Sequence, residues 1–324
     1  MGMHDRPSLG NMISPFGATG EINEEAYRRH IRYMSDAGTG VFVGGPHATE
    51  FVNMDPTERR HLWELAVDEN KGKGPIYAIP FGPGSTEEMI DKFKMAKEIG
   101  FDGAQLYPAA QDGRGADGIF LAEAERYFRD VLEAVEMPMF LCGYHGGEVI
   151  DGPNKQVAPE MLRRLVDDYP HIVGVTVGPP NFDITAGTPN VDAVQGFLDA
   201  IDGKRPVRMA GALDWFQKLE IGVFGFHSIQ QSIAPKLCAS MLESYHAGDK
   251  TRAKALSAKI QQLNEIVHTP RYYYPRSIKP ILNHLGFDTG IIRKPYLPLS
   301  DEVQEEIRRR VDALSDLKEI EGLE

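Results

Sequence analysis

The amino-acid sequence predicts an α/β fold, a (β/α)8 TIM barrel with a C-terminal helical extension. Three observations predict it. Short apolar segments alternate with longer amphipathic ones, and the short segments are apolar along most of their length. Eight such strand–helix units fit into about 250 residues, which is the usual size of a barrel of this kind. Continuous apolar runs are typical of parallel strands that are buried on both faces.

The expected strands are often bounded by Gly or Pro, which interrupt regular structure. In chain order they are residues 10–16, 40–45, 75–82, 103–108, 138–144, 172–178, 207–211 and 223–228. Parallel strands of a barrel all point the same way, so their carboxyl ends surround one mouth, where barrel active sites are built.

The expected helices show apolar residues at helical spacing. Residues 24–38 have this pattern and end at a glycine, and Ser85 and Glu88 form a capping pattern at the start of residues 85–100. Further helices are expected at residues 120–135, 159–170, 251–267, 277–286 and 301–314. We therefore expect the barrel over residues 1–232, its eighth helix to about residue 248, and the extension over residues 249–324.

Composition limits the partners. The formal net charge is −12, which argues against nucleic acid or an anionic membrane as the main partner but does not identify a ligand. We expect the partner to be a small-molecule substrate. The two cysteines lie in apolar segments, so a disulfide framework is not expected and a reducing cytoplasm fits better. The first residues have no apolar signal core, and no apolar run reaches the roughly 18 residues of a membrane span.

Two loops repeat one pattern. GPHATE (residues 45–50) and GYHGGE (residues 143–148) each follow an apolar run and place a Glu three residues after a His. A carboxylate beside an imidazole fixes its tautomer, so His47/Glu50 and His145/Glu148 are candidate acid–base pairs. The spacing is a weak signal outside a helix, because a loop does not fix the direction of either side chain.

Four segments resemble the dihydrodipicolinate synthase / N-acetylneuraminate lyase superfamily. They are residues 14–45, 82–108, 169–175 (YPHIVGV) and 292–302 (IRKPYLPLSDE). The resemblance covers almost the whole chain. It implies a (β/α)8 barrel with a C-terminal helical extension, often a homotetramer. It also implies lyase or hydratase chemistry on 2-oxo acids through a lysine Schiff base.

The residues that carry this chemistry in the superfamily are replaced here. Thr176 stands where the Schiff-base lysine is expected, and a threonine cannot form an imine. Cys142 stands at the place of the catalytic tyrosine, with Tyr144 two residues later. The carboxylate-binding loop keeps Glu50 and loses its paired hydroxyls, although Thr49 remains nearby.

We therefore expect a lyase, aldolase or hydratase that acts on a small oxo-acid-like or carbonyl substrate by acid–base catalysis. The catalytic candidates are His47, Glu50, Tyr144, His145 and Glu148. The substrate-binding candidates are Ser14, Thr49, Tyr107, Cys142, Thr176, Gly211 and His227.

Several alternatives stay open. No cofactor is expected, although His47, His145 and His227 at one mouth could also hold a divalent metal for a metal-dependent lyase. A displaced lysine, Lys155, could form an imine, and a non-catalytic barrel could bind a small metabolite. The Gly-rich loop over residues 145–158 is expected either to cover the mouth as a lid or to pack against another subunit.

Overall fold

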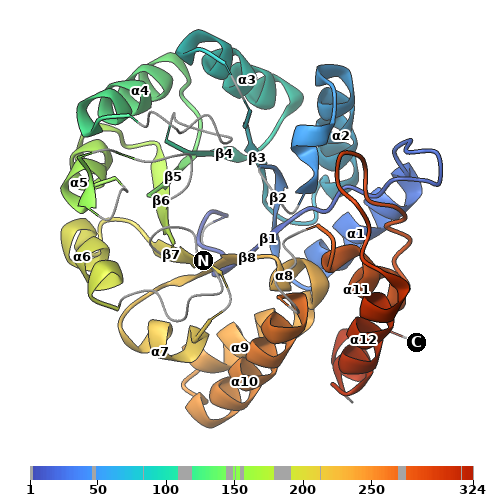
Figure 1. Cartoon of the computed structure of the whole chain (residues 1–324). Coiled ribbons are helices and arrows are strands. Elements are labelled where there is room, and N and C mark those ends of the chain that lie inside the picture. The colour runs from blue at the N-terminus through green and yellow to red at the C-terminus, as the bar shows by residue number, and fades with distance from the viewer. Residues whose placement is uncertain are drawn as a thin grey trace. The chain divides into compact units, whose positions relative to one another are not determined.

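The computed structural model describes residues 3–45, 49–82, 84–108, 119–143, 149, 151–153, 157–178, 191–211, 213–268, 275–314 and 316–323. Eight parallel strands close into one barrel in the order β1 to β8 (Figure 1), which confirms the predicted fold class. The strands are β1 Ser8–Asn11, β2 Gly40–Gly44, β3 Ile76–Ile79, β4 Gly103–Leu106, β5 Met139–Cys142, β6 Ile172–Val177, β7 Val207–Ala210 and β8 Gly225–Ser228.

The first strand lies earlier than residues 10–16, where the sequence placed it. β1 ends at Asn11, and Phe16 makes isolated bridges to Ile22 and Gly290. Pro15 interrupts this stretch, and a proline cannot donate to a strand ladder. The buried apolar residues around it therefore continue the core without continuing the strand.

The contacts gather in two compact units. The first unit comprises residues 1–7, 76–211 and 217–227, and the second comprises residues 8–75, 212–216 and 228–324. The predicted division near residues 232–249 is not tested by this grouping and stays a prediction.

Helices of the first unit follow its strands and lie outside them in Figure 1. They are α3 Thr86–Ile99, α4 Leu121–Ala134, α5 Pro159–Asp168 and α6 Val191–Ile201, and α7 Trp215–Glu220 ends in this unit. Helix α3 begins with the predicted capping box, in which Ser85 and Glu88 each accept a hydrogen bond from the other's backbone N–H.

Helices make up most of the second unit. They are α1 Glu24–Asp36, α2 Pro56–Asn70, α8 Gln230–Ile233, α9 Pro235–His246, α10 Lys250–Val267, α11 Ile278–His284, α12 Asp301–Asp312 and α13 Leu317–Glu321, with a 3-10 turn η2 Phe51–Asn53. Glu321 anchors the last helix. Its buried carboxylate accepts hydrogen bonds from the backbone N–H groups of Lys236 and Leu237 at the start of α9, and from the Tyr33 hydroxyl.

The strand register shows which side chains of the first unit face the barrel interior. Phe140 on β5 contacts Tyr77 on β3 and the guanidinium of Arg208 on β7, with centroid distances of 4.9 and 5.0 Å. These three strands are not neighbours, so their contact crosses the interior. Gln105 pairs with Phe140 in register and Thr176 pairs with Arg208, and register partners share a face. The interior therefore carries polar side chains.

Arg208 fills the interior near the amino-terminal ends of β7 and β8. Its guanidinium donates to the backbone oxygens of His4 and Arg6 at 2.8 and 2.9 Å. Burial lowers the pKa of Arg208 to about 10. Gly174 provides the space, because a Cβ atom there would lie 2.8 Å from Arg208 Nη1.

Candidate functional site

Several predicted site residues lie outside the described part of the chain. They are His47, Tyr144, His145 and Glu148, together with the alternative lysine Lys155. Their proposed roles stay predictions. The loop over residues 145–158 is described only at residue 149 and at residues 151–153 and 157–158, where Asp151 accepts a 2.6 Å hydrogen bond from Leu121 N at the start of α4.

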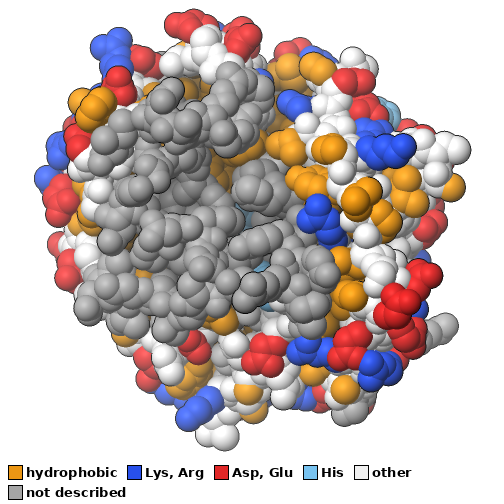
Figure 2. Space-filling view, in the orientation of Figure 1, with side chains coloured by type: hydrophobic (Ala, Val, Ile, Leu, Met, Phe, Trp, Pro, Cys, Tyr) orange, Lys and Arg blue, Asp and Glu red, His pale blue; other side chains and the backbone are white. Residues whose placement is uncertain are grey.

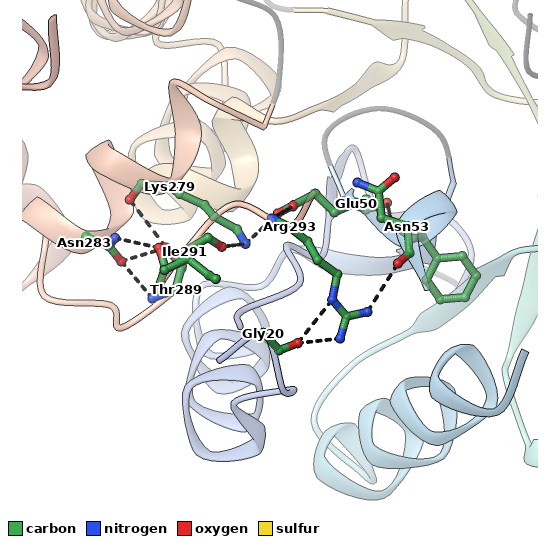
Figure 3. A network of polar contacts seen from close by, with 11 residues as sticks. Gly20, Glu50, Asn53, Lys279, Asn283, Thr289, Ile291 and Arg293 are labelled. Carbon is green, nitrogen blue, oxygen red and sulfur yellow. Dashed lines mark hydrogen bonds and ion pairs between the residues drawn. The ribbon is translucent and has the colours of Figure 1, made fainter. Parts of the chain in front are cut away.

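Glu50 lies at the centre of a buried polar network in the second unit (Figure 3). The Glu50 side chain is 0% exposed, and its Oε2 forms a 2.5 Å ion pair with Nζ of Lys279, which is 1% exposed. Glu50 Oε1 accepts a 2.7 Å hydrogen bond from the backbone N–H of Arg293. Both carboxylate oxygens are therefore engaged by groups of the C-terminal extension.

Lys279 is also fully engaged. Its Nζ donates to the backbone oxygen of Ile291 at 2.5 Å and lies 4.4 Å from the centroid of the Phe16 ring. Burial lowers the pKa of Lys279 to about 8, while Glu50 opposes this shift. Burial likewise raises the pKa of Glu50, against the attraction of Lys279. Burial therefore disfavours the charged form of both side chains, and the attraction between Glu50 and Lys279 favours it.

Arg293 joins the same network to two further segments. Its guanidinium pairs with Glu58 on α2 and donates to the backbone oxygens of Gly20 and Asn53. It also lies 4.2 Å from the centroid of the Phe16 ring. The signature IRKPYLPLSDE, noticed only as a resemblance in the sequence, thus supplies the arginine that joins the C-terminal extension to residues 50–58.

The loop that carries His47 is held at both described ends. Thr49 Oγ1 donates to the backbone oxygen of Gly45 at 2.9 Å and accepts from Phe51 N at 3.3 Å. The backbone of Glu50 is left-handed, with φ of 53°, a conformation that costs energy for a residue with a side chain. Ser14, another predicted binding residue of this unit, is buried.

The first unit holds the remaining predicted binding residues. Thr176 and Cys142 are register partners on β6 and β5, and both are fully buried. Tyr107 follows β4 and contacts the Phe81 ring edge-on at 5.9 Å. Gly211 follows β7 with φ of +86°, and a Cβ atom built on it would meet nothing within 4 Å.

His227 on β8 is a neutral imidazole at physiological pH. Burial lowers its pKa to about 3, and the nearby Arg208 cation adds to this effect. His227 pairs in register with Ala210, which lies two residues after Arg208 on β7 and so shares its face. A histidine that stays neutral can donate or accept a hydrogen bond, but it cannot supply a proton from an imidazolium near neutral pH.

Sequence reasoning missed Gln105. It lies on β4, is fully buried, and meets Thr176 across the interior, where Thr176 Oγ1 lies 3.5 Å from Gln105 Oε1. Gln105 Nε2 has no hydrogen-bond partner among the described residues. The signal was present, because a glutamine interrupts the apolar run GAQLYP.

The described side chains form no group of three or more His, Cys, Asp or Glu that could hold a metal. Two of the three proposed ligands, His47 and His145, lie outside the described residues, so the metal alternative is not tested. Among the residues that the structure describes, no helix is both long and apolar enough to cross a membrane.

A closed parallel barrel with a helical C-terminal extension places the chain among the TIM-barrel proteins. Within this class it belongs to the Dihydrodipicolinate synthetase family, whose sequence pattern matches residues 6–314. The family consists of lyases and aldolases, and the match confirms the superfamily resemblance.

Among the relatives, the 4-hydroxy-tetrahydrodipicolinate synthase of Methanopyrus kandleri is 26% identical over 321 residues, which cover 98% of this chain and 99% of the relative. The enzyme of the same name from Bartonella bacilliformis is 25% identical, with coverage of 96% and 99%. A similar solved structure is that of a prophage protein of the dihydrodipicolinic acid synthase family from E. coli K12 in complex with pyruvate. It has a TM-score of 0.79 and 19% identity, and the match covers 95% of this chain and 98% of that one.

Proposed function

We propose that the protein is a lyase, aldolase or hydratase that acts on a small oxo-acid-like or carbonyl substrate without a lysine Schiff base. The observation that carries the proposal is Thr176. It lies on β6, at the position where the family resemblance places the imine-forming lysine, and it is fully buried inside the first unit. The threonine hydroxyl can donate or accept a hydrogen bond but cannot form an imine.

Lys279 does not replace the missing lysine. A nucleophilic lysine needs a lowered pKa and an amine that the substrate can reach. The pKa of Lys279 is lowered, yet its Nζ is bound to Glu50 and to the backbone oxygen of Ile291. Imine formation there would break a buried ion pair.

Acid–base catalysis is proposed in place of the imine. His47, Tyr144, His145 and Glu148 are the proposed proton-transfer groups. Glu50 is assigned a supporting role, because both of its carboxylate oxygens already bind Lys279 and Arg293. It would hold the loop that carries His47.

Reductive trapping tests the proposal. The protein is incubated with pyruvate and sodium borohydride, and its intact mass is measured, with a known Schiff-base aldolase treated in parallel as the positive control. The expected result is no adduct on this protein. A mass increase that maps to any lysine, with Lys155 the first to inspect, would overturn the proposed mechanism.

Assembly and cofactor use are part of the same proposal. We expect a homotetramer, to which exposed apolar side chains of the second unit would contribute. Leu297 is 73% exposed and Ile291 is 42% exposed, and Figure 2 shows hydrophobic side chains gathered over the segment that follows α11. Light scattering that reports a monomer at micromolar concentration would contradict this assembly.

We expect no cofactor, and a stoichiometric metal found by elemental analysis would favour the metal-dependent alternative.

A further inference from the structure

We propose that Gln105 and Thr176 together bind the reacting carbonyl oxygen of the substrate, with the Gln105 amide N–H as the main donor. The inference rests on the proposed function, because it says how a carbonyl is activated when no imine forms. Two neutral hydrogen-bond donors would hold the oxygen on which negative charge develops.

The strand register places both side chains on the inner face of the first unit. Gln105 pairs in register with Phe140, whose ring contacts residues of β3 and β7 across the interior. Thr176 pairs with Cys142, which lies two residues after Phe140 and therefore on the same face. The 3.5 Å contact between Thr176 Oγ1 and Gln105 Oε1 shows that the two side chains meet.

The amide of Gln105 is poorly satisfied. A glutamine side chain offers two N–H donors and one oxygen acceptor. Here the oxygen makes one contact at the outer limit of hydrogen-bond distance, and Nε2 has no partner among the described residues. If the positions of Oε1 and Nε2 were exchanged, one N–H of Nε2 would face Thr176, and the second N–H would still have no acceptor among the described residues. In both orientations a buried donor is left for a ligand, and buried polar groups of this kind need an explanation.

The electrostatic surroundings suit an oxyanion. Arg208 pairs in register with Thr176, and its guanidinium is fixed to the backbone oxygens of His4 and Arg6. Its positive charge is therefore held in place by these two contacts. Burial lowers the pKa of this guanidinium, and Tyr77 and Asp5 oppose that shift. Fixed donors and charges that face a developing negative charge stabilise it without reorganisation.

The chemical step needs no covalent bond to the protein. In the cleavage direction of a lyase, the bond between the α- and β-carbons breaks and its electron pair forms an enolate, whose oxygen is held by Gln105 and Thr176. A general base takes the proton of the β-hydroxyl group, which becomes the new carbonyl. The proton then returns to the α-carbon, so atoms and charges balance.

Exchange of the methyl protons of pyruvate tests the donor pair without knowledge of the second substrate. Enolate formation exchanges these protons with deuterium in D2O, which is followed by proton NMR. The native protein should catalyse the exchange. Gln105→Met, which keeps the size and removes the amide, should slow it about 100-fold, the typical effect of losing an oxyanion donor. Thr176→Val should also slow it, whereas Thr176→Ser should keep most of the rate.

Matched controls separate binding from folding. Gln195→Met replaces a glutamine of α6 in the same unit, which binds Asp199, and should leave the exchange rate unchanged. Thermal melting reports whether each variant folds, and Thr176→Val provides the answer if Gln105→Met does not fold. Native-rate exchange by a folded Gln105→Met or Thr176→Val variant would overturn the inference, as would the absence of exchange by the native protein. A borohydride adduct on the native protein would instead overturn the proposed function itself, so the two failures are distinguishable.

Discussion

Replacing Lys279 with methionine should destabilise the protein by about 3–5 kcal/mol, the usual effect of removing one partner of a buried ion pair. The change leaves the Glu50 carboxylate buried with the backbone N–H of Arg293 as its described donor. Methionine has a similar length and apolar stem, so the loss would report the missing charge more than a cavity.

The double variant decides whether the pair is coupled. Glu50→Gln removes the negative charge and keeps an oxygen for the N–H of Arg293. Replacing both charges of a buried pair is often neutral or stabilising. Combining Glu50→Gln with Lys279→Met should therefore recover much of the stability lost in Lys279→Met, and the effects of the single changes should not add.

Denaturant unfolding at neutral pH measures these free energies. A matched control is the pair between Lys259 and Asp316, whose side chains are 33% and 42% exposed. Lys259→Met should cost less than about 1 kcal/mol, as is usual for an exposed pair. The reasoning fails if Lys279→Met costs no more than this control, or if the two single changes add.

Three further predictions concern stability. The free energy of unfolding should fall as pH drops below 6.5, because burial lowers the pKa of His30 to about 4 and of His227 to about 3. Below this pH the two histidines bind protons in the unfolded chain but stay neutral in the folded chain. Each histidine therefore lowers the free energy of unfolding by about 1.4 kcal/mol per pH unit. Equal unfolding curves at pH 7.5 and 5.5 would contradict this. Glu321→Ala should cost about 3 kcal/mol in denaturant unfolding, since it removes the acceptor of three hydrogen bonds, and Glu321→Gln should cost less. Arg208→Met should expose residues 3–7 to proteases, because the guanidinium binds the backbone oxygens of this segment; unchanged cleavage in limited proteolysis would refute that role.

Sequence pattern was sufficient for the barrel, because buried parallel strands leave continuous apolar runs that can be read locally. The same reasoning gave no sign of the polar side chains inside the barrel, because it treated each strand segment as uniformly apolar. Gln105 and Arg208 were read as members of apolar strand segments, and only the register between strands shows that their side chains share the inner face. A pairing such as that of Glu50 with Lys279 joins distant parts of the chain, and nothing local in the sequence indicates it.

The ion pair between Glu50 and Lys279 also affects when the chain can fold during translation. A chain emerges from the ribosome amino end first, so Glu50 is made long before Lys279 and Arg293. Until these residues are released, its carboxylate lacks the cation and the N–H that it binds in the folded protein. A nascent or truncated chain that stops before α11 would thus leave the Glu50 carboxylate hydrated, and residues 49–53 would take up their folded contacts only near the end of translation.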